Sequence, residues 1–178
     1  TENDYYVKGL LVLNPRKKIQ PFLISIYEFS ERRQVDFRMI SGLGVSYTAL
    51  QKPNHKLYVQ FAMLYDYTNH NGTNFTILGP RESNIRRIIR PSPRIVGEHF
   101  FKKRDIRIEY KYWFHNSLAR IDDTRMKLDL NIDYKITEWL SFRTALDYFF
   151  ENIVLQGLNS NDLLLSFGIN IHNKNPKK

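Results

Sequence analysis

The sequence predicts an all-β protein, an antiparallel up-and-down transmembrane β-barrel. Apolar and polar side chains alternate over stretches of about ten residues, which gives each predicted strand one apolar and one charged face. Short and long polar links alternate between these stretches, and aromatic residues recur near their ends. A barrel with lipid outside and a polar interior has this pattern, whereas a water-soluble barrel packs its apolar face inward.

We predict nine strands, at residues 5–13, 20–29, 36–49, 56–68, 92–102, 105–115, 124–136, 139–151 and 162–172. The first two contain the uncharged apolar runs 10–13 and 21–27. The third holds Gly42 and Gly44, which permit close packing or bending within a strand. The fourth carries one apolar parity, formed by Leu57, Val59, Phe61, Met63, Tyr65 and Tyr67.

The fifth strand has no clear parity. The sixth and seventh alternate as strictly as the fourth, with apolar residues at even positions from Ile106 to Phe114 and from Met126 to Tyr134. The eighth ends in Tyr148 and Phe150, and the ninth is the apolar segment 163–171. Apolar runs or alternation thus support eight of the nine predicted strands, and the fifth is predicted mainly from its composition.

The links between strands predict the topology. Short links lie at 14–18, 51–55, 102–105 and 137–138, and longer ones at 30–34, 69–90, 116–123 and 152–161. Alternate links of an antiparallel meander lie at opposite ends, so one rim has turns and the other has loops, as in outer-membrane barrels. Nine strands place the chain ends at opposite rims, and an even, closed barrel of about ten to twelve strands therefore needs at least one more.

Aromatic residues support this orientation. Strands that rise toward the long loops end in pairs on the apolar parity, namely Tyr27 and Phe29, Tyr65 and Tyr67, Tyr112 and Phe114, and Tyr148 and Phe150. Tyr47, Tyr134 and Trp139 lie near the short turns. Two aromatic girdles at the membrane surfaces are expected of such a barrel, although aromatic residues also favour strands in general.

Composition sets further limits. The mean hydropathy of −0.46 resembles that of a soluble protein, because alternating strands dilute their apolar signal. No run approaches the roughly 20 apolar residues of a membrane helix, and the absence of cysteine excludes disulfides and thiolate metal sites. We expect one barrel domain at 1–172 and a basic tail at 173–178, with any export signal removed or lying upstream of Thr1.

A family resemblance adds to these patterns. The segments 41–47 and 162–171, the proline-containing turn after the first of them and the tyrosine-rich strand that follows resemble the salt-induced outer-membrane protein family of Gram-negative bacteria, whose function is unknown. The resemblance covers roughly residues 5 to 172. It implies a barrel in the bacterial outer membrane, an export signal and further strands on the N-terminal side of the segment that begins at Thr1, and it brings no catalytic residues.

Arginines surround the longest predicted link. With a net charge of +9 the chain favours an acidic partner, and the densest cluster comprises Arg81, Arg86, Arg87, Arg90 and Arg94. On an outer rim these guanidinium groups are candidates to bind lipopolysaccharide phosphates or another outer-membrane protein. The alternative is a solvated loop. Nucleic acid is not an expected partner, because the basic residues form no stripe on one element.

A second set of charged residues faces the predicted interior. Its members are Asp66, Arg107, Glu109, Lys111, Lys127, Asp129, Asp133, Arg143 and Asp147. Mixed signs on neighbouring strands predict cross-strand ion pairs that fill the lumen. The alternative is a narrow, weakly selective channel or a proton-sensitive gate.

Enzyme signatures are weak. The five histidines show no metal-ligand spacing, and we expect neither a metal nor a cofactor. His115, Asn116, Asp122 and Asp123 share the loop rim, but a hydrated aspartate turn explains them better than water activation. We therefore expect no catalytic residues.

The sequence thus predicts a non-enzymatic outer-membrane barrel, in contact with membrane lipid, with a structural or accessory role in the bacterial envelope. A small-solute channel or transporter is the first alternative, and a soluble calycin-like binding barrel is the second.

Overall fold

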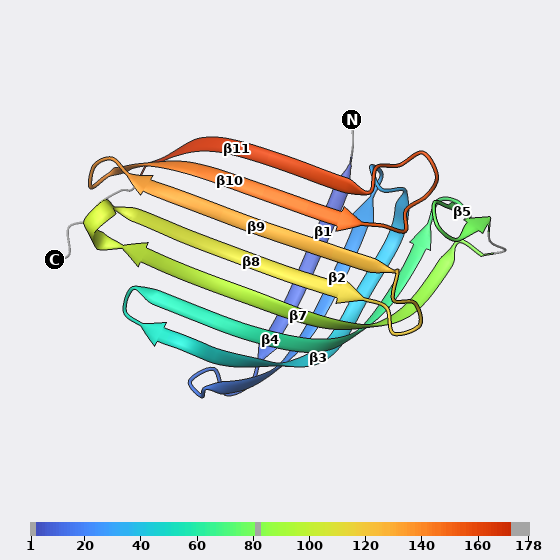
Figure 1. The fold of residues 1–178 in the computed structure, drawn as a ribbon, viewed down its shortest axis with the longest axis horizontal. Coiled ribbons are helices and arrows are strands. Elements are labelled where there is room, and N and C mark those ends of the chain that lie inside the picture. The colour runs from blue at the N-terminus through green and yellow to red at the C-terminus, as the bar shows by residue number, and fades with distance from the viewer. Residues whose placement is uncertain (1–2, 81–82, 172–178) are drawn as a thin grey trace.

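The computed structural model describes residues 3–80 and 83–171. Figure 1 shows one strongly curved sheet whose strands follow each other in chain order. Its members are β1 (Asp4–Val12), β2 (Ile19–Ser30), β3 (Val35–Lys52), β4 (His55–His70), β7 (Ile85–Phe101), β8 (Ile106–Asn116), β9 (Thr124–Lys135), β10 (Leu140–Glu151) and β11 (Asn161–Ile171). Every neighbouring pair is antiparallel. The all-β, up-and-down prediction with nine strands is confirmed.

The links divide into two rims. The turn rim holds the links 13–18, 53–54, 102–105 and 136–139, and the loop rim holds 31–34, 71–84, 117–123 and 152–160. The turn 102–105 contains a short 3-10 helix, η1 (Lys102–Arg104), and the loop 71–84 contains a two-stranded hairpin of β5 (Asn74–Phe75) and β6 (Gly79–Pro80). That hairpin was not predicted. Within the described ranges no helix is long and apolar enough to cross a membrane.

The sheet does not close within the described residues. β1 and β11 are its two ends, and each pairs on one side only. Because nine strands alternate in direction, β1 and β11 run the same way. Near the loop rim the side chain of Arg32 bridges them, with contacts to Asp4 at the start of β1 (3.8 Å) and to Asp162 in β11 (3.5 Å).

The predicted start of the fifth strand was wrong. Residues 85–90 were assigned to a loop, yet β7 begins at Ile85 and pairs with β4 from there. Its pairing with β8 begins only at Arg94. The carbonyl of Ile89 points to the β8 side, where it accepts from the amide of Leu118, so Pro91 and Pro93 lack their N–H groups where no ladder requires them.

The inward faces differ between the two halves of the sheet. On β2, β3 and β4 they form an apolar cluster of Phe22, Ile24, Ile26, Ile40, Ala62 and Leu64. Gly42 and Gly44 lie beneath it, and a side chain at Gly44 would collide with the Phe22 ring and with Ala62. The expected polar interior is therefore not found on this part of the sheet, whose inward face is largely apolar. On β8, β9 and β10 the inward positions are mostly charged.

Candidate functional site

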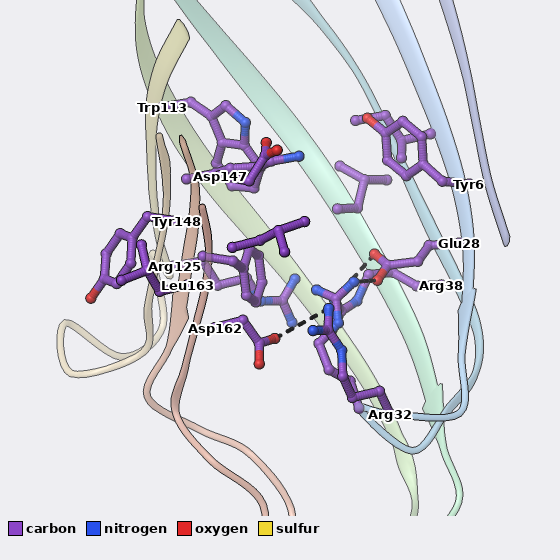
Figure 2. Close-up of a pocket in the computed structure, with 16 residues that line it drawn as sticks. Tyr6, Glu28, Arg32, Arg38, Trp113, Arg125, Asp147, Tyr148, Asp162 and Leu163 are labelled. Atoms are coloured by element: carbon purple, nitrogen blue, oxygen red, sulfur yellow. Dashed lines mark hydrogen bonds and ion pairs between the residues drawn. The ribbon is translucent and has the colours of Figure 1, made fainter. Parts of the chain in front are cut away.

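A cavity of about 440 Å³ lies inside the curved sheet near the loop rim (Figure 2). Tyr6 and Glu28 come from one wall, and Trp113, Asp147 and Leu163 come from the facing wall. Arg33, from the link 31–34, lies over the Phe149 ring, with its guanidinium carbon 4.5 Å from the ring centroid, and pairs with Glu28. Both edge strands contribute to the lining, so the cavity lies beside the gap between them.

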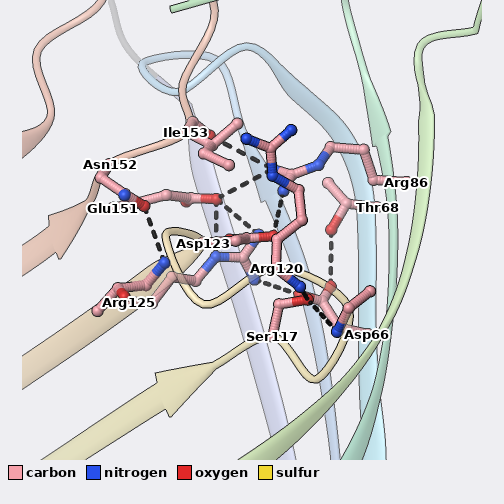
Figure 3. Close-up of polar contacts among 12 residues, drawn as sticks. Asp66, Thr68, Arg86, Ser117, Arg120, Asp123, Arg125, Glu151, Asn152 and Ile153 are labelled. Carbon is pink, nitrogen blue, oxygen red and sulfur yellow. Dashed lines mark hydrogen bonds and ion pairs between the residues drawn. The ribbon is translucent and has the colours of Figure 1, made fainter. Parts of the chain in front are cut away.

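Next to this cavity lies a buried charge cluster of four arginines and four carboxylates. Figure 3 labels five of them, Asp66, Arg86, Asp123, Arg125 and Glu151, and Figure 2 labels Glu28 and Arg38. The members of the cluster are Glu28, Arg38, Asp66, Arg86, Arg90, Asp123, Arg125 and Glu151. They project from six strands and from the link 117–123. Every one of these residues is at most 9% exposed.

Asp123 and Asp66 hold two of the arginines. Arg86 Nη2 donates to Asp123 Oδ2 at 2.6 Å, and Arg90 Nη2 donates to Asp123 Oδ1 at 2.9 Å. Arg90 also donates from Nε to Asp66 Oδ2 at 2.8 Å. Thr68 donates to the other oxygen of Asp66 at 2.8 Å. Each carboxylate oxygen therefore has a charged or hydroxyl donor.

Glu151 connects opposite walls of the sheet. Arg125 Nε donates to Glu151 Oε1 at 2.7 Å from the neighbouring strand. Arg38, on β3, donates to the same carboxylate at 3.2 Å, although β4, β7, β8 and β9 lie between β3 and β10 in the sheet. Arg38 also pairs with Glu28 at 3.3 Å. The cluster therefore spans the interior instead of lining one wall.

The balance of charge explains how this cluster stays buried. Isolated charges in a protein interior are strongly destabilised, and ion pairs compensate only where geometry and hydrogen bonding are good. Four guanidinium groups here face four carboxylates through several charge-assisted hydrogen bonds. Arg33 adds a further cation beside Glu28. The arrangement is therefore a cross-linked layer in which every one of the four carboxylates is paired with at least one arginine.

Two loops form a lid over the charge cluster. Phe75 and Leu78, from the link 71–84, pack against apolar residues of the link 152–160, namely Ile153, Leu155 and Leu158. The backbone joins them as well, with Thr76 N donating to Val154 O at 2.9 Å and Gln156 N to Asn74 O at 2.8 Å. Arg86 donates to the carbonyl of Ile153 at 3.4 Å, which ties the lid to the cluster.

The arginines that were predicted to surround one surface loop do not lie together on a loop. Arg86, Arg90 and Arg94 lie on β7 and point into the interior, where Arg86 and Arg90 belong to the charge cluster. Arg87 is exposed on the opposite face of β7, over the Tyr67 ring. Arg81 lies outside the described residues. These side chains therefore do not form one surface, because β7 extends into the stretch assigned to the loop and alternates its side chains between faces.

The predicted lumen residues form several separate contacts. Asp66 belongs to the charge cluster. Arg143 pairs with Asp133 across β9 and β10 through two bonds of 2.7 Å. Further pairs, nearer the turn rim or the middle of the sheet, are Arg107 with Glu98 and Glu109, and Lys127 with Asp129. Lys111 and Asp129 line a smaller cavity, and Asp147 lines the cavity of Figure 2 beside Lys127.

The polar side chains His115, Asp122 and Asp123 are not arranged to activate a water molecule together. Asp123 is held by Arg86 and Arg90, and the His115 ring stacks on Trp113 with centroids 4.0 Å apart. Asp122 lies on the surface, where hydrogen bonds from Arg120 lower the pKa of its carboxyl. The part of the chain that the structure describes contains no group of three or more histidine, aspartate or glutamate side chains placed to hold a metal ion.

Most of the charge cluster was not predicted as a unit. Arg125 and Glu151 have the same parity as the predicted lumen residues Lys127 and Asp147, so extending the alternation to the strand ends would have included them. Glu28 and Arg38 carried no such signal, because the inward face of β2 is otherwise apolar. Only the curvature of the sheet brings Arg38 to Glu151.

Fold and site define a class of protein, an antiparallel β-meander whose outward faces are apolar and whose interior is bridged by charge. The chain belongs to the family described as protein of unknown function DUF481, whose model matches residues 17–172. The finer name of salt-induced outer-membrane protein stays a resemblance. Neither the curated proteins nor the solved structures include a match.

Proposed function

We propose that this protein is a non-enzymatic outer-membrane β-barrel with a structural or accessory role in the bacterial envelope. The observation that carries the proposal is the apolar band on the outward face of the sheet. Outward residues of β2, β3 and β4 are 37 to 65% exposed, namely Leu23, Tyr27, Leu43, Val45, Tyr47, Val59, Phe61, Met63 and Tyr65. A soluble monomer rarely exposes a continuous apolar surface of this extent, whereas lipid covers it in a barrel.

The unpaired edges support an accessory role. Exposed strand edges invite pairing with another chain segment, and β11 presents an edge rich in apolar side chains from Leu163 to Ile171. Because β1 and β11 run in the same direction, antiparallel closure requires an odd number of additional strands. Barrels of ten or twelve strands meet this condition. We propose that further strands, from this protein or from a larger envelope complex, complete the barrel.

The filled interior favours a barrel that does not conduct over a channel. The lid and the charge cluster lie one above the other at the loop rim, and the cluster crosses the lumen. Passage of a solute would require both to rearrange. A calycin-like soluble barrel is also less favoured, because its apolar faces would line the interior while the outward faces met water.

Membrane lipid is the proposed principal partner. The placement of Arg86 and Arg90 in the interior removes them as surface contacts for lipopolysaccharide. Among the described members of the predicted set, Arg87 is exposed on the outward face and could still contact a lipopolysaccharide phosphate as a single residue.

The orientation can be tested by introducing charge on each face. Phe61→Arg or Leu128→Arg places a cation toward lipid, at a cost of about 2 to 4 kcal/mol near the midplane, and should remove the protein from the outer-membrane fraction. Asn131→Arg is the matched control on the inward face of β9, beside Glu109. It should still give a heat-modifiable, membrane-inserted band on gels. Equal loss in all three variants would contradict the proposed orientation.

A further inference from the structure

Charge is distributed unequally between the two rims. The turn-rim links carry six basic residues, Arg16, Lys17, Lys18, Lys102, Lys103 and Arg104, against Asp105 and Glu138. The loop-rim links carry four basic and four acidic residues, Arg32, Arg33, Arg81, Arg120, Glu31, Glu82, Asp122 and Asp123. The excess positive charge of the links therefore lies at the turn rim.

Five cations of the turn links, and two more on the adjoining strand ends, are exposed. They are Arg16, Lys17, Lys18, Lys102 and Lys103 in the links, with Lys52 at the end of β3 and Lys135 at the end of β9. Within the described ranges, none of the seven has a carboxylate oxygen within 4.0 Å, whereas at the loop rim Arg32 and Arg120 are engaged by aspartates. Unpaired cations are available to an external anion.

Backbone hydrogen bonds join the turns into one continuous rim. Thr48 N donates to Lys18 O at 2.8 Å, Phe100 N to Asn54 O at 2.7 Å, and Lys135 N to Asp105 O at 2.8 Å. Each bond connects one turn to a neighbouring strand end. The cations therefore form an arc along the rim instead of isolated points.

Aromatic side chains lie close to this arc, three of them on strand ends and Trp139 in the turn 136–139. Tyr47, Phe101, Tyr134 and Trp139 are 43 to 54% exposed. Aromatic rings favour the level where headgroups meet hydrocarbon, and Lys and Arg beyond them meet the anionic lipid surface. The order along the strand axis, from apolar band to rings to cations, matches the order of chemistry across a membrane surface.

We propose that the turn rim binds the phosphates of anionic phospholipids in the leaflet that it faces. The inference rests on the proposed membrane-spanning barrel and adds the lipid class that one rim selects. Ammonium groups bind phosphate mainly as point charges, so the selectivity depends on headgroup charge and is weakened by salt.

Trp139 provides a local probe, because it lies in the turn 136–139, which borders the turn 102–105 through the contact of Lys135 with Asp105. The protein is inserted into vesicles of phosphatidylcholine and phosphatidylglycerol in which one lipid or the other carries brominated chains. Brominated phosphatidylglycerol should quench Trp139 about twofold more than brominated phosphatidylcholine, and the difference should vanish at about 1 M salt, where the Debye length is about 3 Å. The Trp139→Phe variant shows which part of the fluorescence comes from Trp139, because the remaining tryptophan, Trp113, faces the interior.

Two variants of equal charge change decide the outcome. Lys102→Gln with Lys103→Gln should reduce the preference for phosphatidylglycerol, while Arg87→Gln with Arg120→Gln, away from the turn rim, should retain it. Equal quenching by both lipids in inserted wild-type protein would overturn the lipid site and leave the barrel intact. Failure to insert into either vesicle, judged by protease protection, would contradict the barrel and the lipid site with it.

Discussion

At the residue scale, the main feature is that buried charges have several partners each. Arg125 contacts both Asp66 and Glu151, and Arg90 contacts both Asp66 and Asp123. Removing one member leaves an uncompensated charge in the interior, which is far more destabilising than losing a surface pair. The cluster should therefore behave as a single unit in mutational tests.

Arg125→Met should lower the free energy of unfolding by about 3 to 5 kcal/mol, because Asp66 and Glu151 lose their shared cation. Urea unfolding of the inserted protein, followed by gel mobility, measures the change. Arg107→Met is the control, since Arg107 is about half exposed and pairs at the surface, and it should cost less than about 1 kcal/mol. Equal midpoints for both variants would show that the buried cluster contributes no special stability.

At the element scale, the lid depends on contacts between loops that are distant in the chain. Phe75 pairs with Leu155 in an isolated β-bridge and is 1% exposed. The His70 ring contacts the edge of Phe75 with centroids 5.0 Å apart. A loop of this length is held in place by such buried side chains, since it has little secondary structure of its own.

Phe75→Ser should release the hairpin of β5 and β6 and increase the rate of proteolysis within residues 71–84, while the strands remain protected. Limited proteolysis with mass spectrometry measures the cleavage sites and rates. Ile77→Ser is the matched control in the same loop, because Ile77 is 47% exposed. If Phe75→Ser cleaved no faster than Ile77→Ser, the lid would not depend on this apolar contact.

At the scale of the whole molecule, the two unpaired edges and the blocked loop rim have different consequences. Within the described residues both edges are open to pairing with further strands, and Arg32 bridges them at one end only. The lid and charge cluster restrict passage through the interior whichever strands complete it. Below them the wall of β2 to β4 is apolar, so polar side chains along the interior come mainly from β8, β9 and β10.

The protein in a planar bilayer should therefore conduct little current. Single-channel recordings at neutral pH measure this directly, with the Phe75→Ser and Arg125→Met double variant as a comparison in which the block is weakened. The double variant should show more frequent openings than wild type. Stable, large conductance steps in wild type would favour the channel alternative over the accessory role.

The sequence by itself determined the strands and their order, because a period of two in hydrophobicity reports the two faces of a strand directly. The clear alternation at 56–68 and 124–136 predicted β4 and β9 to within a few residues. It did not predict the start of β7, where Arg86, Arg90 and two prolines resemble a loop until the buried partners Asp66 and Asp123 are known.

Only the tertiary structure decided how the interior is filled. Arg38 and Glu151 lie 113 residues apart, and the curvature of the whole sheet brings them together. The lid likewise joins the links 71–84 and 152–160, whose short apolar segments carry no periodic signal. The physical reason is that alternation is a local property of one strand, whereas burial of a charge depends on which distant strands face it across the lumen.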